Sequence, residues 1–163
     1  MKVYLVQHGA CLEKTVNPEQ PLSDNGRKDI ESLCQFLSLL SIESQCLWHS
    51  GKLRSQQTAE ILVPSLGSSV TIESREGLAP MDEIGVIEKT IYQLNQNILL
   101  VGHMPFLGKL AAKFLVANET QNLIAFEPGT MVCLAQNEKQ AWQMQWMIRP
   151  DILSQVIHHE LKP

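Results

Sequence analysis

The chain has 163 residues, 44% of them hydrophobic and 18% charged, and a formal net charge of −4 at pH 7. This length predicts one domain, residues 1–163, with a core that needs no disulfide or metal. The acidic balance argues against nucleic acid or an anionic membrane as the main partner.

Membrane and secretion signals are also missing from the sequence. No apolar run approaches membrane-spanning length, and the start is too short for the apolar region of a signal peptide. The four cysteines show no Cys-x-x-Cys spacing. We therefore expect a cytoplasmic protein with reduced thiols.

Apolar runs alternate with helical patterns along the first half of the chain. Residues 3–6 predict a buried strand, and Ser23 is a suitable N-cap for a helix from Asp24. A short strand at residues 46–48 precedes a helix that Pro64 and Gly67 end. A strand at 70–72, a loop at 76–82 and a helix with apolar residues from Ile84 to Leu94 follow.

The second half continues the alternation and then changes. The clearest buried strand covers residues 98–101, and Pro105 suits the first turn of the next helix. Strands at 131–135 and 142–148 flank a polar turn and predict an antiparallel edge hairpin, and a last short helix is predicted from Pro150. The pattern predicts an α/β fold: a single three-layer α/β/α domain with a mostly parallel central sheet and an antiparallel edge hairpin near the C-terminus.

Three polar segments lie where an apolar run ends and a helical pattern begins. Because the carboxyl ends of parallel strands share one edge of a sheet, we expect His8, Arg54 and His103 in one pocket. We expect the two imidazoles to face each other across a phosphate-sized gap. A neutral imidazole is a nucleophile, and an arginine at a helix N-terminus favours an anion. Each segment alone fits an ordinary strand end, but three such coincidences are the poorer account, so the pattern predicts phosphoryl transfer. The segments are Val6-Gln7-His8-Gly9, His49-Ser50-Gly51-Lys52-Leu53-Arg54 and Val101-Gly102-His103-Met104-Pro105.

These residues resemble a known family. The histidine phosphatase superfamily (phosphoglycerate-mutase-like) has three signatures similar to His8-Gly9, Leu53-Arg54 with Gln57-Thr58-Ala59-Glu60, and Gly102-His103 followed by Pro105. Within it, the short chain and Gln20-Pro21-Leu22-Ser23 resemble the SixA-type phosphohistidine phosphatases. The resemblance covers residues 1 to about 150.

The resemblance implies roles for these residues. His8 would attack phosphorus and carry the phosphoryl group, while Arg54 and His103 would hold its non-bridging oxygens. Gly9 and Ser50 would add contacts to phosphate. Water would then release phosphate, with no metal or other cofactor, and the sequence shows no metal-ligand spacing.

The chain departs from the family pattern at two cations. Gln7 stands where the superfamily normally has arginine, and Gln20 where SixA-type proteins often have one. Losing a charged hydrogen bond costs roughly 1.5–3 kcal/mol, although a glutamine amide can still donate to phosphate. Lys52 or Lys14 can partly compensate, and each is equally compatible with an ordinary surface lysine.

A general acid is the second open point. Asp82 is the first candidate and Glu83 the next, but both are also suited to the start of the following helix, where acids favour the dipole. A weak acid suits phosphohistidine, because imidazole leaves more easily than an alkoxide.

Three functions remain open at this point. The first is a phosphatase acting on phosphohistidine of a protein partner, such as a histidine-containing phosphotransfer domain; a short chain without a lid favours it. The second is a phosphatase for a small phosphomonoester, which would need a working acid. The third is a degenerate phosphate- or phosphoprotein-binding module with little turnover, which Gln7 and Gln20 favour. Mutase activity is least expected, and the oligomeric state is open, with a monomer favoured.

Overall fold

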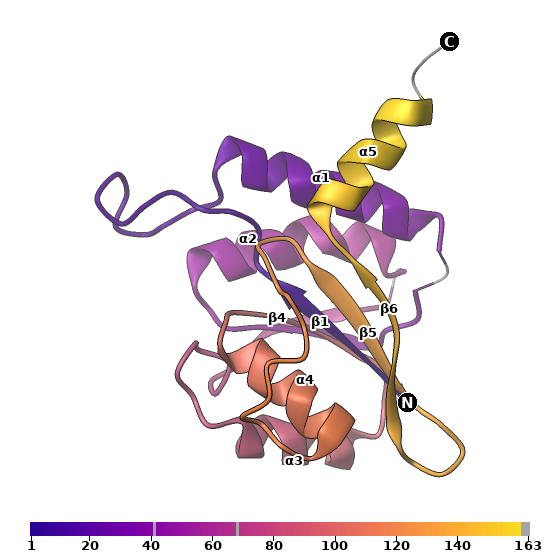
Figure 1. Cartoon of the computed structure of the whole chain (residues 1–163). Coiled ribbons are helices and arrows are strands. Elements are labelled where there is room, and N and C mark those ends of the chain that lie inside the picture. Colours follow the sequence, from indigo (N-terminus) through magenta and orange to yellow (C-terminus); the bar gives the residue numbers. More distant parts are fainter. Residues whose placement is uncertain (41, 68, 161–163) are drawn as a thin grey trace.

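A six-stranded sheet in the order β3-β2-β4-β1-β5-β6 forms the middle layer of the computed structural model (Figure 1). The structure describes residues 1–40, 42–67 and 69–160, with the last four of these as backbone alone. The first four strands along the chain are parallel, and β5 runs antiparallel to both of its neighbours. This mixed sheet confirms the predicted fold class. The strands are β1 (Lys2–Gln7), β2 (Cys46–His49), β3 (Thr71–Ser74), β4 (Ile98–Gly102), β5 (Met131–Gln136) and β6 (Trp142–Ile148).

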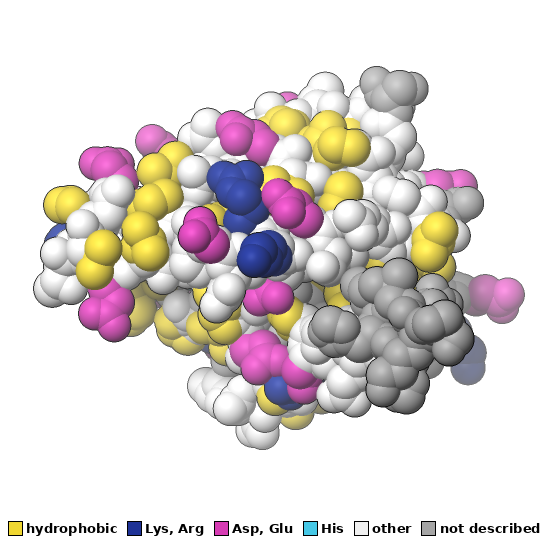
Figure 2. Space-filling model, turned by 90° about the horizontal axis from the view of Figure 1, so that it is seen from above, with side chains coloured by type: hydrophobic (Ala, Val, Ile, Leu, Met, Phe, Trp, Pro, Cys, Tyr) yellow, Lys and Arg dark blue, Asp and Glu magenta, His cyan; other side chains and the backbone are white. Residues whose placement is uncertain are grey.

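Helices cover both faces of the sheet, as a three-layer domain requires (Figure 1). On one face lie α1 (Asp24–Ser38), α2 (Leu53–Leu62) with the short 3-10 turn η1 (Val63–Ser65), and α5 (Pro150–Glu160). The opposite face is covered by α3 (Ile84–Leu94) and α4 (Phe106–Val116). Seen from the α1 side, acidic and basic side chains are interspersed without a broad patch of one sign (Figure 2). Among the described helices, none combines the length and apolar character needed to span a membrane.

The predicted ends of most elements are correct to within one or two residues. Ser23 caps α1 as expected: its Oγ accepts from the Gly26 N–H at 3.1 Å and donates to the Ala10 carbonyl at 3.2 Å. Helix α2 ends at Leu62, and the chain continues into η1, which contains Pro64. A proline ring is tolerated there because it lies in the first turn of a helix. Pro105 occupies the N-cap position of α4 and not its first turn.

The C-terminal hairpin is confirmed, with a change of register that alternation alone does not reveal. Leu134 pairs with Met144 and Cys133 with Trp146, so Gln145 has no partner on β5. Because side chains alternate between faces, this extra residue moves those that follow it to the other face. Trp142 therefore packs with the α3–α4 core, whereas Trp146 packs with the α1–α2 core.

Helix α1 lies directly against the backbone that follows β1. A Cβ on Gly26 would come within 2.0 Å of the Ala10 carbonyl oxygen, and one on Gly9 within 2.8 Å of Ile30 Cγ1. Both contacts leave no room for a methyl group. Because neither glycine has a side chain, α1 packs directly against the backbone of residues 9 and 10 and holds it in place.

We predict that Gly26→Ala lowers the free energy of unfolding by about 1–3 kcal/mol or more, because the rigid Ala10 backbone has to move. The matched control is Gly85→Ala in α3, where an added Cβ meets nothing within 4 Å. That change should raise stability by at most about 1 kcal/mol, as expected for alanine in a helix. Urea unfolding followed by tryptophan fluorescence measures both, and equal stability of the two variants would contradict the packing described.

Candidate active site

His8 immediately follows β1 at the carboxyl edge of the sheet. Its Nδ1 lies 2.8 Å from the Gly9 carbonyl oxygen. A carbonyl only accepts hydrogen bonds, so Nδ1 carries the proton and Nε2 keeps its lone pair. The Nε–H of Arg54 donates to this Nε2 at 3.1 Å. The sequence thus brings the expected imidazole and guanidinium into direct contact.

The surroundings of His8 keep its ring neutral. Burial lowers the pKa of His8 to about 4, the Gly9 carbonyl opposes this shift, and the positive charge of Arg54 adds to it. A neutral imidazole with an unprotonated Nε2 is the form in which histidine acts as a nucleophile. The Arg54 Nε–H is directed at that lone pair. An anion that draws the guanidinium toward itself would free Nε2.

His103 follows β4, the strand next to β1, and is only 2% exposed. Its ring centroid lies 4.7 Å from that of His8, and its Nε2 lies 2.6 Å from Ser50 Oγ. Burial, and then the nearby charges of His8, Arg54 and Lys52, lower the pKa of His103 to about 3. Both histidines are therefore neutral near pH 7.

The prediction of a phosphate-sized gap between the two imidazoles is wrong, because the ring centroids lie 4.7 Å apart. The His8 N–H donates to the Gly102 carbonyl at 3.1 Å, so the two strand ends are locked side by side and the rings that follow them touch. A phosphoryl group would fit at the nitrogen edges of the rings, next to Arg54, and not between their faces. Ser50 lies at that edge beside His103.

Helix α2 holds the loops that carry Gly9 and Ser50 in place through the hydroxyl groups of Ser55 and Thr58. Ser55 Oγ accepts from the Ser50 N–H at 3.1 Å and donates to the Val101 carbonyl at 3.0 Å. Thr58 Oγ1 accepts from the Gly9 N–H, also at 3.1 Å. The N–H and the carbonyl of Gly9 thus both have partners within the chain, which gives Gly9 a positioning role, and its contact with phosphate stays a prediction. No side chain caps the N-terminus of α2, whose first N–H groups are of the kind that favours anions.

The two glutamines that the sequence analysis singled out have different surroundings. Gln20 Oε1 accepts a hydrogen bond from Arg54 Nη1 at 3.4 Å. The backbone of Gln20 itself has a positive φ of 49°. Gln20 therefore contacts Arg54 through its amide oxygen, and its contact with phosphate stays a prediction. Gln7 Oε1 is buried without a hydrogen-bond partner in the described part of the structure. Lys52 is the exposed N-cap residue of α2, and Lys14 is exposed on the loop after His8.

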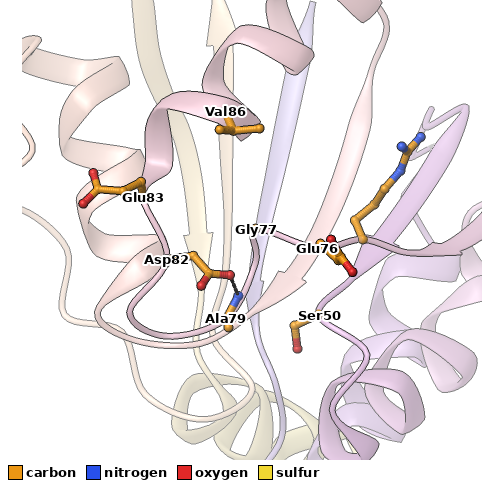
Figure 3. A pocket seen from close by; sticks show the side chains of 8 residues that line it. Ser50, Glu76, Gly77, Ala79, Asp82, Glu83 and Val86 are labelled. Carbon is orange, nitrogen blue, oxygen red and sulfur yellow. Dashed lines mark hydrogen bonds between the residues drawn. The ribbon is translucent and has the colours of Figure 1, made fainter.

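A cavity of about 590 Å³ adjoins this cluster through Ser50 (Figure 3). Asp82 lies in its wall, where Oδ2 accepts from the Ala79 N–H at 2.8 Å. Glu83 is the N-cap residue of α3 but makes no capping hydrogen bond with its side chain. Both acids thus precede the helix and also border the cavity. The complete lining is Ser50, Arg75, Glu76, Gly77, Ala79, Asp82, Glu83 and Val86.

Sequence reasoning missed Glu76 as a site residue. It follows β3 by two positions, at the same edge of the sheet as the other site residues. That placement after a parallel strand was the available signal. In the described part of the chain, no three His, Cys, Asp or Glu side chains form a group that could hold a metal ion.

The amino-acid sequence of this chain is similar to those of known phosphatases. A model of the histidine phosphatase superfamily (branch 1) matches residues 3–90. Phosphohistidine phosphatase SixA of Escherichia coli (strain K12) is 24% identical over 155 residues, which cover 92% of this chain and 94% of that protein.

Solved structures show the same fold. A structure of the protein histidine phosphatase SixA complexed with tungstate matches with a TM-score of 0.82 and 21% identity, over 94% of this chain and 99% of that one. A phosphoserine phosphatase from Entamoeba histolytica in complex with 3-phosphoglyceric acid matches with a TM-score of 0.68 and 12% identity, over 91% and 96% of the two chains. The fold is thus shared by phosphatases whose substrates differ.

The buried neutral histidines predict a dependence of stability on pH. In the unfolded chain, His8 and His103 take up protons with ordinary pKa values of 6.5, but in the folded protein only near 4 and 3. The unfolded state therefore binds more protons between these values, and the free energy of unfolding falls as the pH falls below about 6.5. Urea unfolding from pH 7 to pH 4 should show a shallower fall for His103→Gln than for the unmodified protein. Identical slopes would contradict the neutral state of His103.

Proposed function

Because this chain belongs to the histidine phosphatase superfamily (branch 1), we propose that it hydrolyses phosphohistidine on a protein partner through a phosphorylated His8. The observation that carries the proposal is the state of His8. Its Nδ1–H is held by the Gly9 carbonyl, its Nε2 is unprotonated, and Arg54 lies 3.1 Å from that Nε2. These are a nucleophile and an anion-binding group in contact with each other.

The proposed reaction has two displacements at phosphorus. In the first, His8 Nε2 forms a bond to phosphorus as the bond from phosphorus to the substrate imidazole breaks, and the leaving nitrogen takes up a proton. Arg54 moves from Nε2 onto the phosphoryl oxygens, where His103 and Ser50 also lie. Their contribution is to stabilise the charge that spreads over those oxygens in the transition state.

In the second displacement, water attacks the phosphorylated His8. The bond between Nε2 and phosphorus breaks, inorganic phosphate leaves, and the proton of the water passes to the products. His8 returns to its neutral form, which its burial favours. All of these steps use imidazole, guanidinium and water.

The choice of phosphohistidine rests on the leaving group and on a relative. Asp82, the expected acid, already accepts a hydrogen bond from Ala79, and a protonated imidazole leaves without a strong acid. The Escherichia coli relative is named a phosphohistidine phosphatase. We propose a partner such as a histidine-containing phosphotransfer domain, and a cytoplasmic location, with which four free cysteines agree.

One observation favours a second candidate, a phosphatase for a small phosphomonoester. Glu76, Asp82 and Glu83 line the cavity beside Ser50, and a carboxyl group is the kind of side chain that would serve as the general acid for an alkoxide. A phosphate-binding module with little turnover is the third candidate, and the buried unpartnered oxygen of Gln7 is what favours it.

We predict that incubation with a phosphorylated histidine-containing phosphotransfer protein leaves an acid-labile, base-stable phosphate on His8. Rapid quenching followed by mass spectrometry locates it. His8→Ala should abolish both the modification and turnover, whereas a chelator should change neither, because no proposed step uses a metal. Full activity of His8→Ala, or complete loss with a chelator, would refute the mechanism. A phosphoenzyme that forms but does not turn over would favour the binding module.

The two substrate classes are distinguished by Asp82→Asn. If the physiological substrate is phosphohistidine, this change should alter its kcat/KM by less than about threefold, since imidazole leaves easily. Hydrolysis of an alkyl phosphomonoester should fall by about 10²-fold or more if Asp82 is the acid, the usual contribution of such a group. Glu76→Gln is measured alongside, to test the other carboxylate. Efficient hydrolysis of an ester, lost in either variant, would favour the second candidate.

A further inference from the structure

The cavity beside the catalytic cluster is placed to receive whatever carries the phosphate. Ser50 belongs to both: its Oγ lies 2.6 Å from His103 Nε2, and it lines the cavity of about 590 Å³. A substrate whose phosphorus lies at His8 would extend its next atoms past Ser50 into this space. The cavity is also larger than one imidazole ring, so it has room for a neighbouring side chain.

The charge of the cavity is negative. Among the described lining residues the cation is Arg75, and its charge is paired: its Nη2 lies 2.7 Å from Glu73 Oε2 and its guanidinium carbon 4.5 Å from the centroid of the Trp48 ring. Figure 3 shows Glu76 next to Ser50, Asp82 across from it with its carboxyl turned to Ala79, and Glu83 directed away from the other labelled side chains. Three acidic residues thus line an opening that adjoins the cluster of His8, Arg54 and His103 through Ser50.

This arrangement separates two charges along the path of a substrate. Arg54 attracts the phosphoryl group at one end, and the carboxylates repel a second anion at the other. A ligand that fits both ends carries a cation about one side chain away from its phosphate. Val86 and Ala79 add apolar surface, against which the methylene groups of a long basic side chain can pack.

We propose that this cavity recognises a lysine or arginine next to the phosphohistidine of the partner protein. The substrate class is then phosphohistidine within a basic segment, and Glu76 and Glu83 determine that preference. The inference rests on the proposed function of His8. It adds a rule for which phosphohistidines are accepted.

Binding of uncleavable peptides tests the preference without turnover. Two labelled peptides carry a hydrolysis-resistant triazole phosphonate in place of phosphohistidine, one flanked by lysines and one by glutamates. Fluorescence anisotropy measures both dissociation constants at low salt. We expect the lysine peptide to bind about tenfold more tightly, with the difference shrinking at about 1 M salt, where charges are screened.

Charge reversal of the cavity provides the matched variants. In the double variant Glu76→Lys with Glu83→Lys, the glutamate peptide should bind more tightly than the lysine peptide. The control reverses Glu31 on α1 and Glu138 in the β5–β6 turn, both exposed and outside the cavity lining, and should keep the original preference. Circular dichroism checks that each variant is folded.

The outcomes separate this inference from the function on which it rests. Equal binding of both peptides, or a preference that survives reversal of Glu76 and Glu83, would overturn the inference alone. Absence of binding by either peptide would overturn it together with the proposed substrate. A preference that reverses in the control variant would assign the effect to net charge and would also overturn it.

Discussion

The hydrogen bond between His8 Nδ1 and the Gly9 carbonyl is the constraint on which the rest of the site depends. It decides which nitrogen of the ring carries the proton, and so which one has a lone pair. The carbonyl can do this only if the Gly9 backbone stays where it is. Thr58 on α2 and Ile30 on α1 hold it from two directions, since one accepts its N–H and the other leaves no space beside it. Packing between helices thus determines a protonation state.

Helix α2 connects this constraint to the remaining parts of the site. Over its first two turns, Arg54 reaches His8, Ser55 joins the Ser50 loop to β4, and Gln57 accepts from the Leu22 N–H at 2.8 Å. These bonds end at both ends of the β1–α1 connection, on the loop after β2 and on β4. A helix is stiff over this length, so these segments keep a common geometry.

The sequence predicted the elements better than the contacts between them. Buried strands and amphipathic helices were predictable because periodicity and caps are local, as at Ser23. The meeting of His8, Arg54 and His103 followed from the rule for parallel sheets. The closeness of the two rings did not, because it depends on the pairing of β1 with β4. The acceptor role of Gln20 was likewise hidden, since it depends on how a loop folds back onto Arg54.

The unpaired Gln145 in β6 affects how readily copies of the protein can pair edge to edge. Strand β6 is the outermost strand on its side, and a regular edge offers a row of free N–H and C=O groups to another chain. A bulge twists such an edge and breaks that row. At the other side, β3 is four residues long, and Glu73 in it bears a charge. Both borders of the sheet are therefore poor templates for the addition of a strand from another copy of the chain.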